Sequence, residues 1–334
     1  MSVTLLPAVS VKPSRVSYYT LFEGLSRNKN REKFHNEQIT ESTKHNGVIS
    51  KKANTRVRDA IDWMLFLSEN KTTYSIKRGK NFSYKLGFLT LTLASKQRHS
   101  DNEIKKTLLN HFLVVLRSKY KVSNYLWRAE AQLNGNIHFH IVVDKFIAYQ
   151  EIRKDWNRIQ DKLGYIAHYS SKMKEKYKKG FYYSTGDKYH RGIIQQLHAY
   201  RLGVRQGWYN PNSTDIHSIK KVRNLSAYIA KYCSKNSNEI DEEGKSTLRY
   251  RAIEGKLWGL SNSLSSMKSA KDLCTNAIQE DYLRLKKCEK IRFAEFDYVT
   301  VFFVNTKELK EAGCGALLAL FFSYVQEFKK KKSS

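Results

Sequence analysis

The stretch Ile137–Asp144 (IHFHIVVD) decides how the fold of this chain is interpreted. It is short, apolar and rich in β-branched residues, and these features predict a β-strand. Because side chains alternate along a strand, His138 and His140 should leave one face while Phe139 leaves the other. Two neighbouring imidazoles provide half of a divalent-metal site. The simpler alternative is a pair of half-buried histidines that fill a sheet, and the flanking sequence has to distinguish the two.

The residues before this strand offer further ligands for a metal ion. Tyr125–Leu133 is predicted to be its antiparallel partner, and the Asn-Gly-Asn sequence between the two predicts a tight turn. With a three-residue turn, Gln132 pairs with His138 and Glu130 pairs with His140, so both share the histidine face. A two-residue turn shifts the register by one and moves both to the opposite face. A set of nitrogen and oxygen donors suits Mn²⁺ better than Mg²⁺.

The surrounding pattern predicts an α+β fold. Thr73–Leu93 has the alternation of a β-hairpin, and a capping box formed by Ser100 and Glu103 predicts the start of an amphipathic helix. A second helix is predicted at Ile152–Leu163, where Gly164 ends it. The element order β-β-α-β-β-α describes a central antiparallel sheet with flanking helices.

The composition favours nucleic acid as a partner. The chain has 60 Lys and Arg against 31 Asp and Glu, a formal net charge of +29 that exceeds what solubility requires. Such a field attracts phosphate polyanions and repels acidic partners. The 21 Tyr and 16 Phe lie among the basic residues, as a base-stacking surface requires. Ser170–Gly180 is predicted to be a basic loop that faces phosphate, and the candidate DNA-binding residues are Lys172, Lys174, Lys178, Lys179 and Arg223.

Several classes of protein are not expected from this sequence. The four cysteines form no C-x-x-C pair, which argues against a zinc site or a disulfide framework. No basic segment precedes the apolar stretch Thr4–Val11, so no signal peptide is expected. Ala312–Val325 is too short to span a bilayer and predicts a buried helix. We therefore expect a cytoplasmic protein with no membrane partner.

A second group of candidate residues lies in Leu225–Lys235 (LSAYIAKYCSK), which predicts a helix capped by Asn224. Positions i, i+3 and i+4 are neighbours on a helix, so Tyr228, Lys231 and Tyr232 should share a face. A phenol has a pKa of about 10 and becomes a useful nucleophile only beside a cation or a metal. Lys231 could stabilise the phenolate or a phosphate oxygen. The simpler alternative is a buried aromatic stripe on a basic helix.

Three segments together resemble the motifs of the HUH endonucleases: Phe88–Thr92 (FLTLT), Glu130–His140 (EAQLNGNIHFH) and Tyr228–Lys235 (YIAKYCSK). The order of the motifs matches, and so does a Glu eight residues before the first His. The two tyrosines are most similar to those of rolling-circle replication initiators from microvirus-type phages and related plasmids. The resemblance covers Leu86–Ser261, and the combination is specific although each motif alone is weak.

The resemblance implies a metal-dependent single-strand endonuclease and strand transferase on an HUH/RRM-like palm. A tyrosine would form a 5′-phosphotyrosine and release a 3′-OH primer, and the stored bond energy would allow rejoining without ATP. The implied cofactor is Mn²⁺ or Mg²⁺, and the implied partners are single-stranded origin DNA, a host helicase and a DNA polymerase in the cytoplasm. The implied site residues are His138, His140, Glu130 and Gln132 for the metal, and Tyr228, Tyr232, Lys231 and Lys235 for catalysis.

The same reasoning divides the chain into three parts. Residues 1–55 are polar and patternless and predict an N-terminal arm or lead-in. Residues 56–264 are the HUH endonuclease domain, which begins with a predicted helix at Arg56–Ser68. Residues 265–334 are a C-terminal α/β extension, mostly helical, with a basic tail. Its predicted elements are a strand at Tyr298–Asn305, a helix at Lys307–Phe328 and the tail at Lys329–Lys332.

Other functions stay open at this point. A plasmid relaxase or transposase of the same superfamily is one, although relaxases usually carry an N-terminal nucleophilic Tyr and a third His. The H-x-H-x-D-H motif of another nuclease class is not met, because Val142 and Val143 occupy its last two positions. A non-catalytic single-stranded nucleic-acid-binding protein is the alternative from outside enzymology. An intrinsic helicase is not expected, because Glu239 stands where the phosphate-binding loop ending in Gly244-Lys245-Ser246 needs its first Gly.

Overall fold

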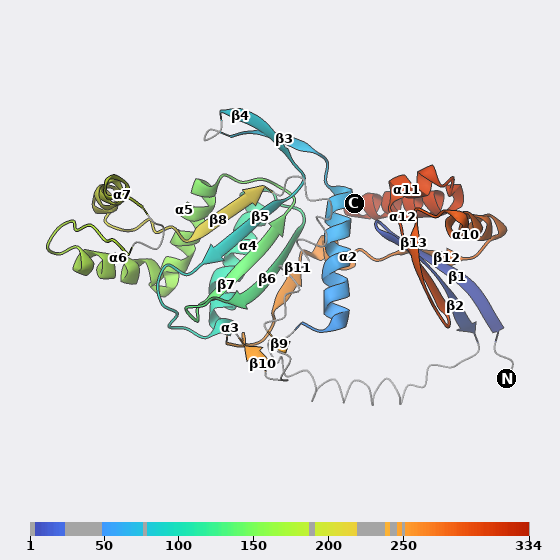
Figure 1. Cartoon of the computed structure of the whole chain (residues 1–334), viewed down its shortest axis with the longest axis horizontal. Coiled ribbons are helices and arrows are strands. Elements are labelled where there is room, and N and C mark those ends of the chain that lie inside the picture. Colours follow the sequence, from blue (N-terminus) through green and yellow to red (C-terminus); the bar gives the residue numbers. More distant parts are fainter. Residues whose placement is uncertain are drawn as a thin grey trace. The chain divides into compact units, whose positions relative to one another are not determined.

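The computed structural model of the chain describes residues 4–23, 49–75, 79–186, 191–218, 238–240, 246–248 and 251–333 (Figure 1). Two compact units are formed, unit 1 by residues 1–44, 58–67 and 262–334, and unit 2 by residues 45–57 and 68–261. Every strand pair among the described residues is antiparallel, and helices accompany both large sheets. The predicted α+β class is therefore confirmed.

Unit 2 is built on a five-stranded sheet of order β11-β6-β7-β5-β8. Its strands are β5 (Gly87–Thr92), β6 (Tyr125–Ala131), β7 (Ile137–Val143), β8 (Thr214–Ser218) and β11 (Trp258–Leu260). Phe139 on β7 is fully buried and lies edge to face with Trp156, which in turn meets Phe112. These aromatic rings join the helices to one face of the sheet, so alternation along β7 turns the two histidines to the other face.

The helices of unit 2 follow the predicted order with one error. They are α3 (Asp101–Ile104), a π-helical segment (Lys105–Leu109), α4 (Asn110–Ser118), α5 (Tyr149–Gln160), a 3-10 turn (Asp161–Leu163), α6 (Tyr165–Lys176) and α7 (Ile193–Arg205). Ser100 caps α3 by accepting from the Glu103 backbone N–H, as predicted. The predicted loop at Ser170–Gly180 is wrong in its first half, because the buried Tyr165 and Ile166 anchor a helix that continues through the lysines.

Two short hairpins complete unit 2. They consist of β3 (Lys71–Ser75) with β4 (Lys80–Tyr84), and β9 (Asn238–Ile240) with β10 (Ser246–Leu248). We predicted one strand from Phe82 to Leu93, but the chain divides there into β4 and β5, which belong to different sheets. A Cβ at Gly87 would lie 2.7 Å from the Lys145 carbonyl oxygen, so the chain passes too close to its neighbour for a larger residue.

Unit 1 contains a second five-stranded sheet, of order β12-β1-β2-β14-β13. Its strands are β1 (Thr4–Lys12), β2 (Arg15–Glu23), β12 (Ala270–Leu273), β13 (Arg292–Phe296) and β14 (Val299–Phe303). The structure thus differs from the N-terminal arm that we expected. Val9 and Val16 are fully buried, and this apolar alternation makes the first two strands part of a core instead of a loose lead-in.

The helices of unit 1 are α9 (Asn262–Ser266), α10 (Asn276–Lys287), α11 (Thr306–Glu311) and α12 (Gly315–Ser333), while α2 (Lys51–Leu67) is shared between the two units. The single helix predicted at Lys307–Phe328 is interrupted at Gly313, whose φ of +71° a helix cannot contain. The predicted tail at Lys329–Lys332 instead continues α12. None of the helices in the described part of the chain combines the length and apolarity that crossing a bilayer requires.

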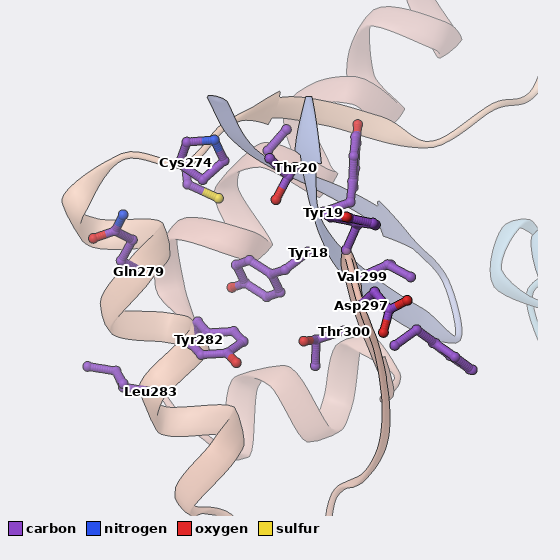
Figure 2. A pocket seen from close by; sticks show the side chains of 14 residues that line it. Tyr18, Tyr19, Thr20, Cys274, Gln279, Tyr282, Leu283, Asp297, Val299 and Thr300 are labelled. Atoms are coloured by element: carbon purple, nitrogen blue, oxygen red, sulfur yellow. The ribbon is translucent and has the colours of Figure 1, made fainter. Parts of the chain in front are cut away.

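A cavity of about 460 Å³ lies in unit 1 between β2, β14 and α10 (Figure 2). Tyr18 and Tyr282 meet there edge to face, with ring centroids 4.9 Å apart. The Tyr18 hydroxyl donates to the Ile278 carbonyl at 3.0 Å, and burial raises the pKa of this phenol well above its usual value. A phenol in that state is a structural group and not an activated nucleophile.

Candidate metal centre

Three ligand atoms converge on the face of the unit 2 sheet opposite the helices. His138 and His140 lie on β7, and Glu130 lies on the neighbouring strand β6. The two Nε2 atoms are 2.9 Å apart, and Glu130 Oε1 is 2.8 Å from each of them. Adjacent ligands of an octahedral ion with bonds of about 2.1 Å lie about 3.0 Å apart. The three atoms therefore have the spacing and the donor types of one face of a divalent-metal site.

The strand register corrects our predicted pairing. Glu130 lies opposite His138, and Arg128 lies opposite His140, whereas we expected Gln132 and Glu130 in these places. The shift is two residues, so Glu130 keeps the predicted face. The connection is longer than the predicted three-residue turn, because the Gln132 N–H donates to the Asn136 carbonyl at 2.8 Å. Gln132 thus follows the end of β6, and its role as a ligand stays a prediction.

The surroundings of the three residues favour the protonation states that bind a metal. The side chains of Glu130, His138 and His140 are 29%, 13% and 9% exposed. Burial opposes ionisation of Glu130, but hydrogen bonds with both histidines outweigh it and hold the pKa well below its usual range. Burial also lowers the pKa of His140. An ionised carboxylate and neutral imidazoles are the forms that coordinate divalent ions.

Neighbouring groups fix the orientation of His140 more than that of His138. His140 Nδ1 is 3.2 Å from Thr90 Oγ1 on β5, and the Phe88 ring stacks on the imidazole at 5.2 Å. A hydrogen bond to the second ring nitrogen is the usual means of orienting a ligand histidine. The Nδ1 atom of His138 is buried and has no hydrogen-bond partner among the residues that the structure describes.

Arg128 is a residue that sequence reasoning missed. It is 4% exposed and lies opposite His140 in the register, so its side chain shares the face of the metal centre. Its positive charge contributes to the lowered pKa of His140. The signal was available, because Arg128 and Glu130 are two positions apart on one strand. A basic residue on this face adds charge that suits a phosphate substrate.

A hydrogen-bond network holds the hairpin that carries the site. Arg251 donates to both oxygens of Asp101, at 2.6 and 2.7 Å, and to the Gly135 carbonyl in the turn at 2.7 Å. Gln97 donates to the same carboxylate at 2.8 Å and accepts from the Ile137 N–H at 2.7 Å. The turn and the first residue of β7 are therefore tied to the start of α3. This attachment positions the histidine that follows Ile137.

The Asp101 carboxylate predicts a pH dependence of stability. Burial opposes its ionisation, but hydrogen bonds from Arg251 and Gln97 outweigh it and lower its pKa. A lowered folded-state pKa stabilises the fold above the unfolded value near 3.9, and this contribution is lost as pH falls through the folded-state pKa. We expect Asp101→Asn to lower the free energy of unfolding at pH 7 by about 2 kcal/mol, allowing for the partly exposed Arg251.

Urea unfolding followed by tryptophan fluorescence measures this difference between pH 7 and pH 2.5. The gap between wild type and Asp101→Asn should shrink steadily below about pH 4. Glu103→Gln, an exposed carboxylate in the same helical turn, is the matched control and should show a change within about 0.5 kcal/mol. A gap that stays constant down to pH 2.5 contradicts the role of the ionised Asp101.

The remaining predicted residues are placed only in part. Lys172 and Lys174 are exposed on α6, and Lys178 and Lys179 are exposed in the turn that follows it. Arg223, Tyr228, Lys231, Tyr232 and Lys235 lie outside the described residues, as does the helix predicted for them. Their roles stay predictions.

Comparison with known protein families gives one result for the stretch that holds the metal centre. Residues 87–237 match a family model for the replication-associated protein ORF2. The match covers less than half of the chain and includes Glu130, His138, His140 and both candidate tyrosines. It supports membership of this stretch in a family of rolling-circle replication initiators. Neither the curated proteins nor the solved structures gave a significant match.

The metal centre predicts a clear ranking of two neighbouring side chains. Glu130→Gln replaces a charged ligand oxygen by an amide and should weaken Mn²⁺ binding by at least about a hundredfold. Gln132→Ala changes a residue beyond the end of β6 and should weaken Mn²⁺ binding less than tenfold. Mn²⁺ titration of each protein by electron paramagnetic resonance measures both constants. A larger loss for Gln132→Ala than for Glu130→Gln contradicts our choice of the third ligand.

Proposed function

We propose that this chain initiates rolling-circle replication by nicking single-stranded origin DNA and later rejoining the displaced strand. The observation that carries the proposal is the converging set of Glu130, His138 and His140, within the stretch that matches the family of replication-associated proteins. The positive charge of the chain supports a DNA substrate. The finer assignment to the HUH superfamily, with two tyrosines, rests on the sequence motifs.

The proposed reaction is attack of a tyrosine on a DNA phosphate. A divalent ion, Mn²⁺ or Mg²⁺, held by Glu130, His138 and His140 would polarise the scissile phosphate as a Lewis acid. The phenolic oxygen of Tyr228 or Tyr232 loses its proton and bonds to phosphorus, while the bond to the 3′ oxygen breaks and that oxygen takes up a proton. The products are a 5′-phosphotyrosine and a free 3′-OH. One phosphodiester bond replaces another, so attack by a 3′-OH reseals the strand without ATP.

Other residues of the chain support this reaction. Thr90 and Phe88 hold the ring of His140, and Arg128 adds positive charge on the same face. Lys231 and Lys235 follow the two tyrosines at the same spacing, and we assign them to stabilise a phenolate or a phosphate oxygen. The lysines of α6 and the following turn, together with Arg223, would bind the DNA backbone.

Unwinding and synthesis would come from other proteins. The sequence around Gly244 lacks the first Gly of a phosphate-binding loop, so the proposal assigns duplex opening to a host helicase. The released 3′-OH would prime a host DNA polymerase. These partners place the reaction in the cytoplasm, of the host cell if a phage encodes the chain.

A second candidate is a non-catalytic protein that binds single-stranded nucleic acid. The net charge of +29 and the exposed lysines favour it as much as they favour a nickase. A relaxase or transposase of the same superfamily would share the metal centre but transfer a different strand. The two groups of function differ in their response to metal removal.

Cleavage of labelled oligonucleotides tests the proposal. Single strands tiled across the DNA that encodes the chain, labelled at the 5′ end, are incubated with the full chain and Mn²⁺. We expect one shortened labelled product that a DNA polymerase can extend from its 3′-OH. EDTA should stop cleavage and leave binding intact, because binding rests on many Lys and Arg contacts. Binding without cleavage of any strand supports the non-catalytic alternative.

A further inference from the structure

The lobe formed by α6, α7 and the turns that follow them contains a row of aromatic rings. Trp208 stacks on Tyr177 with ring centroids 5.1 Å apart and an interplanar angle of 3°. Tyr182 continues the row at 5.5 Å from Tyr177. The last ring is 47% exposed, so the row ends at the surface. Two further rings near it, Tyr183 and Tyr209, are 46% and 53% exposed.

The inner end of the row is held rigidly. A Cβ at Gly203 would lie 2.1 Å from the Trp208 ring, so only glycine allows the indole to pack on α7. Gly207 and Trp208 both have positive φ angles, 58° and 63°. Ser170 on α6 donates to the Gly207 carbonyl at 2.6 Å and fixes this turn. A rigid row loses little conformational entropy when a planar ligand stacks on it.

Cations surround the exposed rings. Lys174 Nζ lies 5.5 Å from the Tyr209 ring centroid, and Lys176 Nζ lies 5.6 Å from that of Tyr182. The only carboxylate among the described residues of the lobe is Glu175. The basic residues described there are Lys172, Lys174, Lys176, Lys178, Lys179, Arg191, Arg201 and Arg205. Ring and ammonium thus alternate on one surface.

We propose that this lobe is a stacking surface for the bases of single-stranded DNA, with Tyr182 and Tyr209 as the stacking rings and Lys174 and Lys176 as phosphate contacts. The inference rests on the proposed function for its DNA substrate and extends it with a second binding site. Single-strand-binding surfaces combine aromatic rings that stack bases with cations that follow the backbone. In duplex DNA the base faces are covered, so the rings would select single strands.

The lobe lies apart from the metal centre within unit 2. Figure 1 shows α6 and α7 at the end of the unit beyond α5 and β8, while the histidines lie on the central strand β7. A strand bound at both places would span the distance between them. The surface would therefore hold DNA next to the cleavage site without contacting the scissile phosphate.

Binding of two oligonucleotides in EDTA tests the proposal without cleavage. One is a base-bearing single strand, and the other is an abasic strand of the same length and charge. We expect the wild-type chain to bind the base-bearing strand at least about tenfold tighter. Tyr182→Ala with Tyr209→Ala should remove most of this difference and leave both the abasic affinity and the salt dependence unchanged. Fluorescence anisotropy measures all of these constants.

Two control variants separate stacking from general damage. Tyr182→Phe with Tyr209→Phe keeps both rings and should bind within about twofold of wild type. Tyr74→Ala removes a ring that is 58% exposed on β3 of the same unit and should change nothing. Equal affinity of the wild-type chain for the two strands overturns the proposal, whatever the variants do. A chain that prefers bases in this assay but never cleaves DNA keeps the stacking surface and refutes the nickase.

Discussion

Replacing His138 or His140 by alanine is expected to abolish DNA cleavage. Each change removes one of the three ligand atoms that lie within 2.9 Å of one another, and no other described His, Cys, Asp or Glu completes the group. Loss of Lewis-acid catalysis costs several kcal/mol of transition-state stabilisation, which corresponds to a rate reduced about a thousandfold or more. Initial cleavage rates at saturating Mn²⁺ measure the effect.

DNA binding should survive both histidine changes. Binding rests on many Lys and Arg contacts, so the affinity and its salt dependence should stay within about twofold of wild type. His111→Ala, a half-buried histidine on α4 that is outside the group, is the matched control and should cleave normally. Wild-type cleavage by either site variant in Mn²⁺ would show that the metal centre is assigned wrongly.

The second large effect concerns Tyr228 and Tyr232, which we expect to alternate as nucleophiles. Closing a replicated circle needs a second cut while the first phosphotyrosine persists, and one tyrosine cannot serve both. Two phenols one helical turn apart can take turns at a single site. Tyr228→Phe and Tyr232→Phe should therefore each still form covalent adduct with single-stranded DNA. Only the double variant should form none.

The yield of adduct on a denaturing gel separates this mechanism from a single nucleophile. The double variant should lose at least about a thousandfold in yield, because a phenylalanine offers no attacking oxygen. Tyr209→Phe, in the lobe formed by α6 and α7, serves as the control and should leave the yield unchanged. Loss of every adduct in Tyr228→Phe alone, on every substrate, contradicts alternation and returns Tyr232 to a binding or packing role.

The face of the metal centre could be predicted from the sequence, but its register could not. Alternation along β7 places His138 and His140 together whatever the turn, and any even shift keeps Glu130 with them. The length of the turn depends on contacts that are distant in sequence. Gln97 holds Ile137, and Arg251 holds Gly135, and no local pattern reveals either bond.

The N-terminal strands show a second limit. β1 pairs with β12, and β2 pairs with β14, so the partners of these strands lie more than 250 residues further along the chain. Val9, Val11, Val16 and Tyr18 alternate as buried residues, but the pattern is short and interrupted by the turn at Pro13. For α6 the lysines concealed the helix, because only its first turn carries buried apolar residues.

The measurement that most directly tests the proposed chemistry is detection of a covalent protein–DNA adduct. A randomised single-stranded DNA pool, labelled at the 3′ end, is incubated with the full chain and Mn²⁺ and then separated on a denaturing gel. Because the phosphotyrosine would hold the 5′ end of the downstream fragment, that label should move with the protein, and the band should vanish in EDTA. A chain that binds the pool equally with and without EDTA and never carries the label would contradict the nickase.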